Sequence, residues 1–493
     1  MIRNARFGVV LVVLIVLASS SRAEEFRTLS RSELLDRIRG GWAGQMIGDI
    51  QGLPFEFKYK NAPGPLPDFV PNLPRCKSDD DTDVEWVNLM AMDRLGVLEV
   101  PYPELAREWI RSINRNIWVS NKTARELMGQ GILPPWTSHG ALNPHARYNL
   151  SGQFCAESYG FLAPGLPAAS ARIGAHYTHI TVRGEPIQAC AYWTSMVSLA
   201  FFERDIERLA DRSLGAVDPA SQHAEMVKDI LAWYRAAPED WIATRAKIQK
   251  KFRDERHWNM NATVTNGGLV LAALLYGKGD FALTLRLAFA LGYDADCNAA
   301  TCGAILGVMH GARSLEAHRG WVLPTIYENR TRDGLPKTQT MDEVVAVTAR
   351  LAEKVILANG GKREGDRDAM VYRLPVREPA LLEHLEPDTT ETSESVQAAI
   401  DREALERLSS ESVLARMFAA IRLARHKHDG LGAAESGRVR RILSDALEDP
   451  VLAPLAKAAL DSLAVAPRRT LRACFRIHFS FVFVQGKGDE ASD

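Results

Sequence analysis

Apolar residues recur at intervals of three and four along most of the chain between Leu34 and about Leu357. The clearest runs are 187–202, 267–275 and 344–357, where this spacing gathers the apolar side chains on one face of a helix. Alternation of apolar and polar residues, which is typical of strands, interrupts the pattern in few places. The sequence therefore predicts an all-α fold built on a compact helical domain.

Four glycines, Gly40, Gly44, Gly48 and Gly52, follow one another at intervals of four residues. In a continuous helix they form one stripe without side chains, along which a neighbouring backbone can approach closely. We therefore expect this stripe to pack tightly against another element of the core.

The composition is that of an ordinary globular protein, with 46% hydrophobic and 25% charged residues. A chain of 493 residues is long for one domain, so two are expected. The segment 359–366 is rich in glycine and charge, and 386–395 is again polar and acidic. We expect a first domain over residues 24–365 and a C-terminal extension over residues 366–493.

The extension has a helical texture of its own. Segments 410–421 and 449–460 resemble each other at an offset of roughly 39 residues, close to the period of HEAT-type repeats. Two such repeats cannot cover their apolar faces, so the extension is expected to pack against the first domain and to serve as support or as a surface for a protein partner. A terminal strand that needs cover is predicted from alternating residues. These are Phe475, Ile477, Phe479, Phe481 and Phe483.

The first 23 residues have the features of a secretory signal peptide. Arg3 and Arg6 precede the apolar run 7–18, and Ser21-Arg22-Ala23 offers the small residues that a signal peptidase recognises. This run is shorter than the ~20 residues of a membrane-spanning helix, so residues 1–23 predict export to the periplasm or the medium without a membrane span. Removal of this segment changes the formal charge from -1 to -4, so bulk charge does not favour nucleic acid.

Six cysteines are few for so long a chain, and none forms a CxxC pair. Export permits disulfides, but the fold does not require them. Most of the six are expected to be small buried side chains. They are Cys76, Cys155, Cys190, Cys297, Cys302 and Cys474.

Two acidic clusters, Asp79-Asp80-Asp81-Thr82-Asp83 and Asp294-Ala295-Asp296, lie more than 200 residues apart, each beside an apolar stretch. Adjacent aspartates cannot share one helix face, so the first cluster belongs to a loop or the first turn of a helix. Taken alone, that cluster is as consistent with helix capping and solvated surface as with a functional site. The second lies between two apolar segments, where charges need partners. If the fold joins the clusters, hard divalent cations are the simplest neutralising partners, and the protein is a metal-dependent enzyme.

Three segments, in order, resemble the ADP-ribosylglycohydrolase family: Gly44 to Phe57, Asp79 to Asp83 and Gly292 to Thr301. Segment 151–167 and the pair Thr178-His179 resemble the middle of exported bacterial members. The resemblance covers residues 34 to about 320. It implies an all-helical fold around two divalent metal ions, usually Mg2+, with Mn2+ as the alternative.

The resemblance also implies roles for individual residues. Asp79 stands where the family often has a threonine, and Cys297 stands at the threonine position of the second motif, where a thiol is a poor ligand for magnesium. Glu56 matches the family's remaining acidic group and, with Asp80 and Asp296, is predicted to be catalytic, acting on the water or the ribose diol. The implied metal ligands are Asp79, Asp80, Asp81, Asp294, Asp296 and Cys297.

Three further polar residues, Gln153, Glu157 and His179, are predicted to bind substrate. In the family a Thr-His pair near this place lies close to the ligand. The structural alternatives are a hydrogen-bonding histidine and polar positions on helices.

The function implied is metal-dependent hydrolysis of the N- or O-glycosidic bond of a small-molecule or protein-linked ADP-ribosyl substrate, or of a related ribosyl substrate. Cleavage at the anomeric carbon passes through an oxocarbenium-like state that a positioned water and a carboxylate promote. One alternative is a hydrolase of a simpler nucleoside or glycoside. Another is a catalytically silent binding protein whose extension recognises a partner, and metal content distinguishes it from an enzyme.

Overall fold

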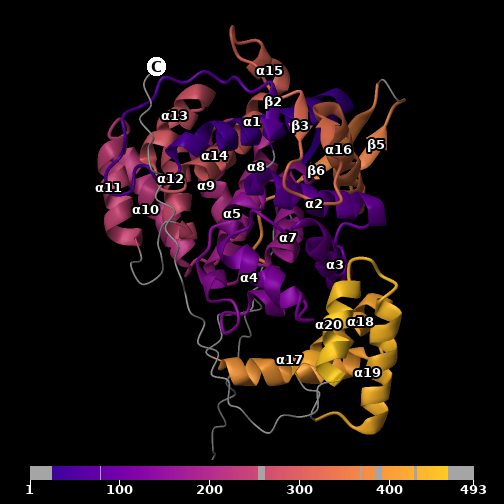
Figure 1. Ribbon diagram of the computed structural model, residues 1–493. Coiled ribbons are helices and arrows are strands. Elements are labelled where there is room, and N and C mark those ends of the chain that lie inside the picture. Colours follow the sequence, from indigo (N-terminus) through magenta and orange to yellow (C-terminus); the bar gives the residue numbers. More distant parts are fainter. Residues whose placement is uncertain are drawn as a thin grey trace, which may run out of the picture.

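The computed structural model describes residues 25–77, 79–253, 261–366, 369–382, 391–426 and 430–464 (Figure 1). The predicted signal peptide, residues 1–23, and the predicted strand from Phe475 to Phe483 lie outside the described residues. Helices dominate the described part, which adds only two small three-stranded sheets. The all-α prediction is confirmed.

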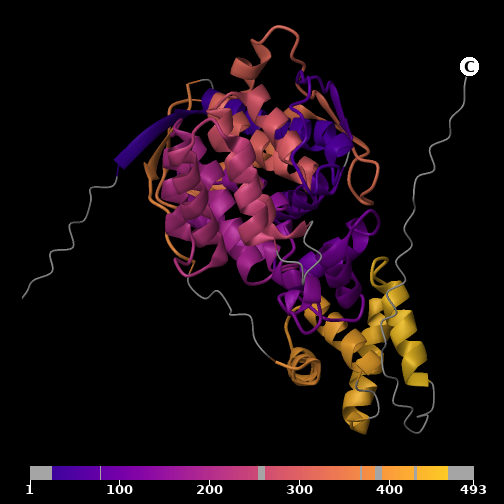
Figure 2. The ribbon, with the colours of Figure 1, turned by 90° about the vertical axis from the view of Figure 1, so that its left-hand side faces the viewer.

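The helices form a large body and a smaller group of four at the C-terminal end (Figures 1 and 2). The large body contains α1 (Arg31–Gly52), α2 (Asp80–Leu95), α3 (Tyr102–Ser112), α4 (Val119–Met128), α5 (Ser151–Phe154), α6 (Glu157–Phe161), α7 (Pro167–Thr178), α8 (Glu185–Ala200), α9 (Ile206–Ser213), α10 (Gln222–Ala236), α11 (Trp241–Phe252), α12 (Thr263–Gly277), α13 (Phe281–Leu291), α14 (Ala295–His310), α15 (Ala312–Glu316) and α16 (Met341–Ala358). The smaller group contains α17 (Ser393–Arg407), α18 (Val413–His426), α19 (Ala433–Ala446) and α20 (Ala453–Ala464). Within the described residues, none of these helices is both long and apolar enough to cross a membrane.

The glycine stripe of α1 lies directly against α14. A Cβ atom added at Gly44 would lie 2.0 Å from the carbonyl oxygen of Gly303, and one added at Gly48 would lie 2.1 Å from that of Ala299. The approach is mutual, because a Cβ atom at Gly303 would lie 2.0 Å from the carbonyl oxygen of Gly44. The expected tight packing of this stripe is confirmed, and it fixes the position of α14 relative to α1.

We expect Gly44→Ala to lower the free energy of unfolding by about 1–3 kcal/mol or more, because the added methyl group forces the α1 and α14 backbones apart. Gly437→Ala is the matched control, since a Cβ atom there meets nothing within 4 Å in helix α19. The control should be neutral or stabilising by up to ~1 kcal/mol. Urea unfolding of both variants measures the difference, and equal stability would contradict the packing described.

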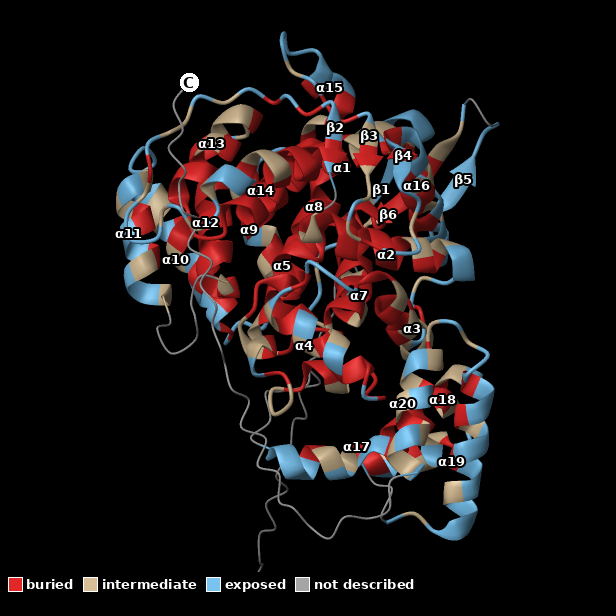
Figure 3. Ribbon diagram, in the orientation of Figure 1, coloured by how far each residue is buried: buried red, intermediate tan, exposed pale blue. Residues whose placement is uncertain are grey.

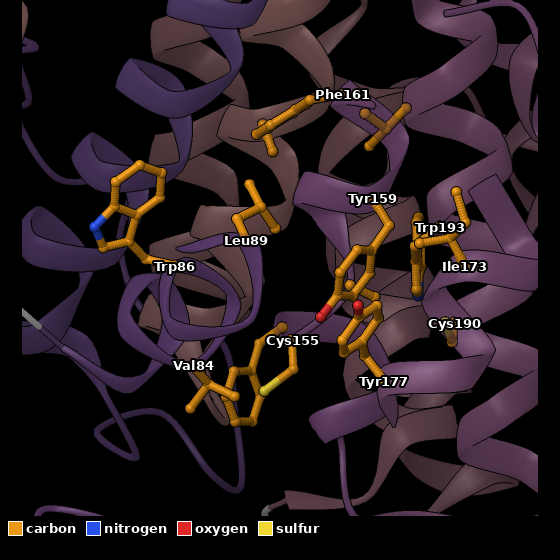
Figure 4. Packing of buried hydrophobic residues seen from close by; sticks show 14 of the residues in the cluster. Val84, Trp86, Leu89, Cys155, Tyr159, Phe161, Ile173, Tyr177, Cys190 and Trp193 are labelled. Carbon is orange, nitrogen blue, oxygen red and sulfur yellow. The ribbon is translucent and has the colours of Figure 1, made fainter. Parts of the chain in front are cut away.

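The central helices are mostly buried (Figure 3), and buried aromatic side chains pack between them (Figure 4). The rings of Tyr159 in α6 and Tyr177 in α7 stack with 5.1 Å between centroids. Asn88 of α2 donates a hydrogen bond from Nδ2 to the Tyr159 hydroxyl at 2.9 Å, which satisfies this polar atom in the core. Trp86 of α2 and Phe161 of α6 both pack edge-on against Trp42 of α1. This core holds α2, which carries the first acidic cluster, in a fixed position.

Two sheets tie distant segments to the helical body. The first has the order β1-β6-β5 and is antiparallel, and in the second β3 pairs in parallel with β2 and antiparallel with β4. Strand β2 ends two residues before Asp79, so the second sheet positions the entry to α2. The strands are β1 (Glu25–Ser30), β2 (Arg75–Lys77), β3 (Ile326–Glu328), β4 (Thr338–Thr340), β5 (Lys362–Glu364) and β6 (Val371–Val376).

The predicted domain boundary near residue 365 falls between β5 and β6. Because β6 pairs along its whole length with β1, residues up to Val376 share a sheet with the first strand of the chain. Of the two proposed folding units, residues 24–365 and 366–493, the second therefore contributes strand β6 to a sheet of the first. The division remains a prediction about folding, while the helices of the extension begin at Ser393.

The C-terminal helices pack against the large body, as expected. Leu127 and Ile132 form a small buried cluster with Val396 and Ile400 of α17. An ion pair between Arg107 Nε of α3 and an oxygen of Asp449, 2.7 Å apart, fixes the other end of the group. Figure 3 shows that the outer sides of α17 and α19 are largely exposed.

Candidate metal centre

The first acidic cluster forms the start of α2. Asp79 is the extended residue before the helix, and Asp80 and Asp81 occupy its first turn. This agrees with the expectation that adjacent aspartates require a helix start. Asp79 and Asp80 are half-buried and line a pocket, whereas Asp81 is fully buried. The three carboxylates therefore face different surroundings.

Asp83, the last acid of this cluster, has a structural role. Its Oδ2 lies 2.9 Å from Nε of Arg332, and both side chains are fully buried. The hydroxyls of Thr331 and Tyr327 also donate to Asp83. Burial raises the pKa of Asp83 to about 6, although the Arg332 charge acts in the opposite direction. Arg332 also donates to the carbonyl oxygen of Asn116 at 3.1 Å, so it joins α2 to the segment before α4.

The second acidic cluster begins α14. Gly292 and Tyr293 have positive φ angles of 80° and 60°, which turn the chain sharply between α13 and Asp294. The Asp294 amide donates to Asn266 Oδ1 at 3.3 Å, and Asn261 donates from Nδ2 to Asp294 Oδ2 at 2.5 Å. These contacts hold Asp294 immediately before the helix. Asp296 follows in the first turn of α14.

Glu56 is carried to the same place by a backbone connection. The short helix η1 (Leu53–Phe55) ends α1, and the Phe57 amide then donates to the carbonyl oxygen of Tyr293 at 2.7 Å. The Tyr293 amide in turn donates to the carbonyl oxygen of Tyr59 at 3.2 Å. The buried Arg245 guanidinium donates to carbonyl groups of both segments. The loop after α1 is thereby fastened to the loop before α14.

The two acidic clusters meet. Asp296 belongs to three overlapping groups of residues that could bind a metal ion. Within each group, one ligand atom of every residue lies within 4.8 Å of those of the others. They are Asp49, Asp79, Asp81 and Asp296; Glu56, Asp294 and Asp296; and Asp81, Asp296 and Cys297. Asp80 lines the adjacent pocket. The glycine stripe makes this possible, since a Cβ atom at Gly52 would lie 2.6 Å from the Asp296 Cα atom.

The unpaired oxygens of these carboxylates suit divalent cations. Within the described residues, Oδ1 of Asp49, Asp81 and Asp296 is buried without a hydrogen-bond donor. Burial, reinforced by neighbouring carboxylates, raises the pKa of all three groups well above the ordinary value. Buried anionic oxygens without donors are costly unless a cation neutralises them. The residues therefore fit divalent cations held by oxygen ligands.

A pocket of about 330 Å³ opens onto this centre. Its lining includes acidic side chains of the centre and the polar groups of Asn121, Asn149 and Ser151. Ser151 donates from Oγ to Asn121 Oδ1 at 2.9 Å, which fixes both side chains. Trp118 and Phe154 supply apolar surface. An apolar surface with a few fixed polar groups is typical of small-molecule sites.

The predicted substrate-binding residues lie outside the lining of this pocket. Gln153 is buried and donates from Nε2 to Asn298 Oδ1 at 3.3 Å, and Glu157 accepts from Thr301 Oγ1 at 2.5 Å. His179 lies at the end of α7, where burial lowers its pKa to about 4. A role in substrate binding stays a prediction for Gln153, Glu157 and His179.

Sequence reasoning missed four residues that build the site. Asp49 contributes a carboxylate, Asn261 holds Asp294, and the buried Arg245 and Arg332 fix the loops around the centre. For Asp49 a signal was present, because it lies in the first of the three segments that carry the family resemblance. No local pattern marks the other three.

Two more carboxylates, Glu85 and Glu157, lie buried behind the centre. Glu85 accepts from Gln45 Nε2 and from the Ser158 amide, both at 2.9 Å. Burial and the Glu157 charge raise the pKa of Glu85, and burial raises the pKa of Glu157 to about 7. The Thr301 hydrogen bond acts in the opposite direction on Glu157. The pair therefore retains protons at a pH where exposed glutamates have lost theirs.

We expect the metal-free protein to lose stability as the pH rises from about 4.3, the value of an unfolded glutamate, to about 7, the folded pKa of Glu157. Over this range the folded state binds more protons than the unfolded state, so the free energy of unfolding falls with pH. Glu157→Gln should reduce this slope. Urea unfolding at several pH values in a chelator measures it, and identical slopes for both proteins would refute the assignment.

The fold and the acidic centre together define an all-helical protein with buried carboxylates of the kind that holds metal ions. The family model described as ADP-ribosylglycohydrolase matches residues 30–358, which is more than half of the chain and includes every residue of the acidic centre. The chain belongs to the ADP-ribosylglycohydrolase family. A comparison with curated proteins found no match.

Proposed function

We propose that this protein is an exported hydrolase that uses two divalent cations, Mg2+ or Mn2+, to release an ADP-ribosyl group from a nitrogen or oxygen of its acceptor. The observation that carries the proposal is the meeting of Glu56 and Asp296 at one pocket, with Asp81 buried beside Asp296 and an unpaired oxygen on each of the two aspartates. Family membership supports glycosidic cleavage. The four C-terminal helices are proposed as a support that also offers exposed surface to a protein partner.

The proposed ligands are Asp49, Asp79, Asp80, Asp81, Asp294, Asp296 and Cys297. Divalent cations held there would acidify a water molecule and bind the ribose hydroxyls. Hydrolysis then joins the water oxygen to the anomeric carbon while the bond to the leaving nitrogen or oxygen breaks. The proton lost by the water passes to a carboxylate and on to the leaving group.

Glu56 is the proposed acceptor of this proton. Its side chain lines the pocket and is only partly exposed to solvent there, and one of its oxygens lies within 4.8 Å of oxygens of Asp294 and Asp296. Partial burial, the Asp294 charge and the Asp79 charge raise the pKa of Glu56 to about 7. A carboxylate with a pKa near the working pH suits proton transfer. The same position also allows it to hold the ribose diol.

The polar lining of the pocket would orient the rest of the substrate. Asn121 and Ser151 are connected by a hydrogen bond, so their remaining donors and acceptors have fixed directions. Such groups distinguish a substrate that carries hydroxyl or phosphate oxygens from one that lacks them.

A hydrolysis screen tests the proposal. The full chain, freed of metal with a chelator, is given Mg2+ or Mn2+ and offered ADP-ribosyl-arginine, ADP-ribosyl-serine, O-acetyl-ADP-ribose and simple nucleosides. We expect release of the ADP-ribosyl product only after metal is returned. Turnover of nucleosides alone would replace the substrate with a simpler ribosyl compound. Failure to hydrolyse any of these compounds would favour a binding protein.

A further inference from the structure

The sulfur of Cys297 lies among carboxylates instead of apolar side chains. Cys297 Sγ lies within 4.8 Å of one oxygen each of Asp81 and Asp296, and its thiol donates to Asp81 Oδ2 at 3.3 Å. The residue is only 6% exposed, yet it lines the pocket. Among the cysteines in the described residues, only Cys297 joins a group of this kind.

A nearby cysteine shows what a structural thiol looks like in this helix. Cys302, five residues later in α14, is fully buried and donates to the carbonyl oxygen of Val270 at 3.7 Å. It belongs to none of the possible ligand groups. Packing alone therefore accounts for Cys302 but not for a sulfur that faces two carboxylates.

The surroundings of Cys297 also point to a ligand. Oδ1 of Asp81 and Oδ1 of Asp296 are buried and lack a hydrogen-bond donor among the described residues. These two aspartates are 0% and 4% exposed. Two unpaired carboxylate oxygens beside a thiol form an incomplete ligand set of one sulfur and two oxygens.

The other two groups at the centre contain only oxygen atoms. They are Asp49, Asp79, Asp81 and Asp296, and Glu56, Asp294 and Asp296. Oxygen ligands suit Mg2+ and Mn2+, whereas a thiolate favours Zn2+, Co2+ or Fe2+ and is a poor ligand for Mg2+. The centre thus offers chemically different positions to its cations.

We propose that one of the two cations of this centre is held by Cys297, Asp81 and Asp296, a position selective for a thiophilic cation such as Zn2+, Co2+ or Fe2+, while the other cation, Mg2+ or Mn2+, occupies an all-oxygen position. The proposal rests on the metal centre of the proposed function and specifies its metals. On binding, the Cys297 sulfur coordinates as a thiolate, and its proton is released to the solvent.

The test is spectroscopic and uses the full chain with Co2+ as the probe. Wild-type protein and Cys302→Ser should develop a near-ultraviolet thiolate-to-cobalt charge-transfer band, whereas Cys297→Ser should not. X-ray absorption of the Zn2+-loaded wild-type protein should give a Zn–S distance of ~2.3 Å. This measurement needs no variant and so remains decisive if Cys297→Ser does not fold.

Metal competition provides a second readout. The ratio of Zn2+ to Mg2+ affinity should fall at least ~10-fold in Cys297→Ser and stay unchanged in Cys302→Ser. A wild-type protein without the band and without a Zn–S distance overturns the inference, even if it hydrolyses ADP-ribosyl compounds with Mg2+. A band in a protein that hydrolyses none of them supports the inference while the proposed function fails.

Discussion

Asp296→Asn should abolish most of the metal affinity and, with it, the hydrolysis. Asp296 belongs to all three groups of possible ligands, and its buried Oδ1 has no donor in the described residues. An amide keeps the shape of the side chain but removes the charge that a cation requires. We expect the affinity for Mn2+, measured by calorimetry, to fall by more than ~100-fold, since changes outside the ligand sphere already cost up to that much.

The metal-free stability of the same variant separates loss of binding from loss of folding. Burial and the charges of Asp294 and Glu56 raise the pKa of Asp296, so its neutralisation removes repulsion in the metal-free protein. The melting temperature of Asp296→Asn in a chelator should equal or exceed that of the wild type, while stabilisation by added metal disappears. Asp445→Asn, an exposed change in α19, is the control and should retain wild-type affinity. Wild-type affinity in Asp296→Asn would exclude Asp296 as a ligand.

Glu56→Gln should cut turnover by ~10²–10⁴-fold while metal binding is largely retained, because a positioned acid or base contributes about this much to the rate. Glu56 reaches only one of the three ligand groups, through the loop fastened to Tyr293. Single-turnover hydrolysis and calorimetry with Mn2+ measure the two effects separately.

Glu56→Asp gives a matched variant that keeps the charge but withdraws the carboxylate. We expect it to bind metal as the wild type does and to retain more activity than Glu56→Gln. Full activity in Glu56→Gln would remove this residue from the mechanism and leave an aspartate ligand as the base. Equal loss of metal affinity in Glu56→Gln and Asp296→Asn would instead make Glu56 a ligand.

The elements with regular spacing could be predicted from the sequence. The glycines from Gly40 to Gly52 are spaced four residues apart, which places them on one face of a helix. Helix α14 packs against that face. Burial of so many charges requires shared neutralisation, which favours a fold that joins the acidic clusters at 79–83 and 294–296. Asp79 and Asp81 do meet Asp296. Helix class and the principal acidic residues follow from local patterns of this kind.

Residues that act through tertiary contacts could not be predicted. Asn261 acquires its role from a hydrogen bond to Asp294, 33 residues later, and Arg332 reaches Asp83 from 249 residues away. No pattern in the sequence around Asn261 or Arg332 indicates these partners. Strand β6 is a similar case, since its pairing with β1 joins the two ends of the large body across the boundary that composition had suggested.

Diffraction from crystals of the full chain soaked in Mn2+ tests the central claim most directly, because anomalous scattering locates the ions without reference to activity. We predict peaks at ~2.0–2.6 Å from carboxylate oxygens, the range for oxygen ligands of hard cations. They should lie between Asp81 of α2 and Asp296 of α14. A fully soaked crystal without a peak between these two residues would contradict the account.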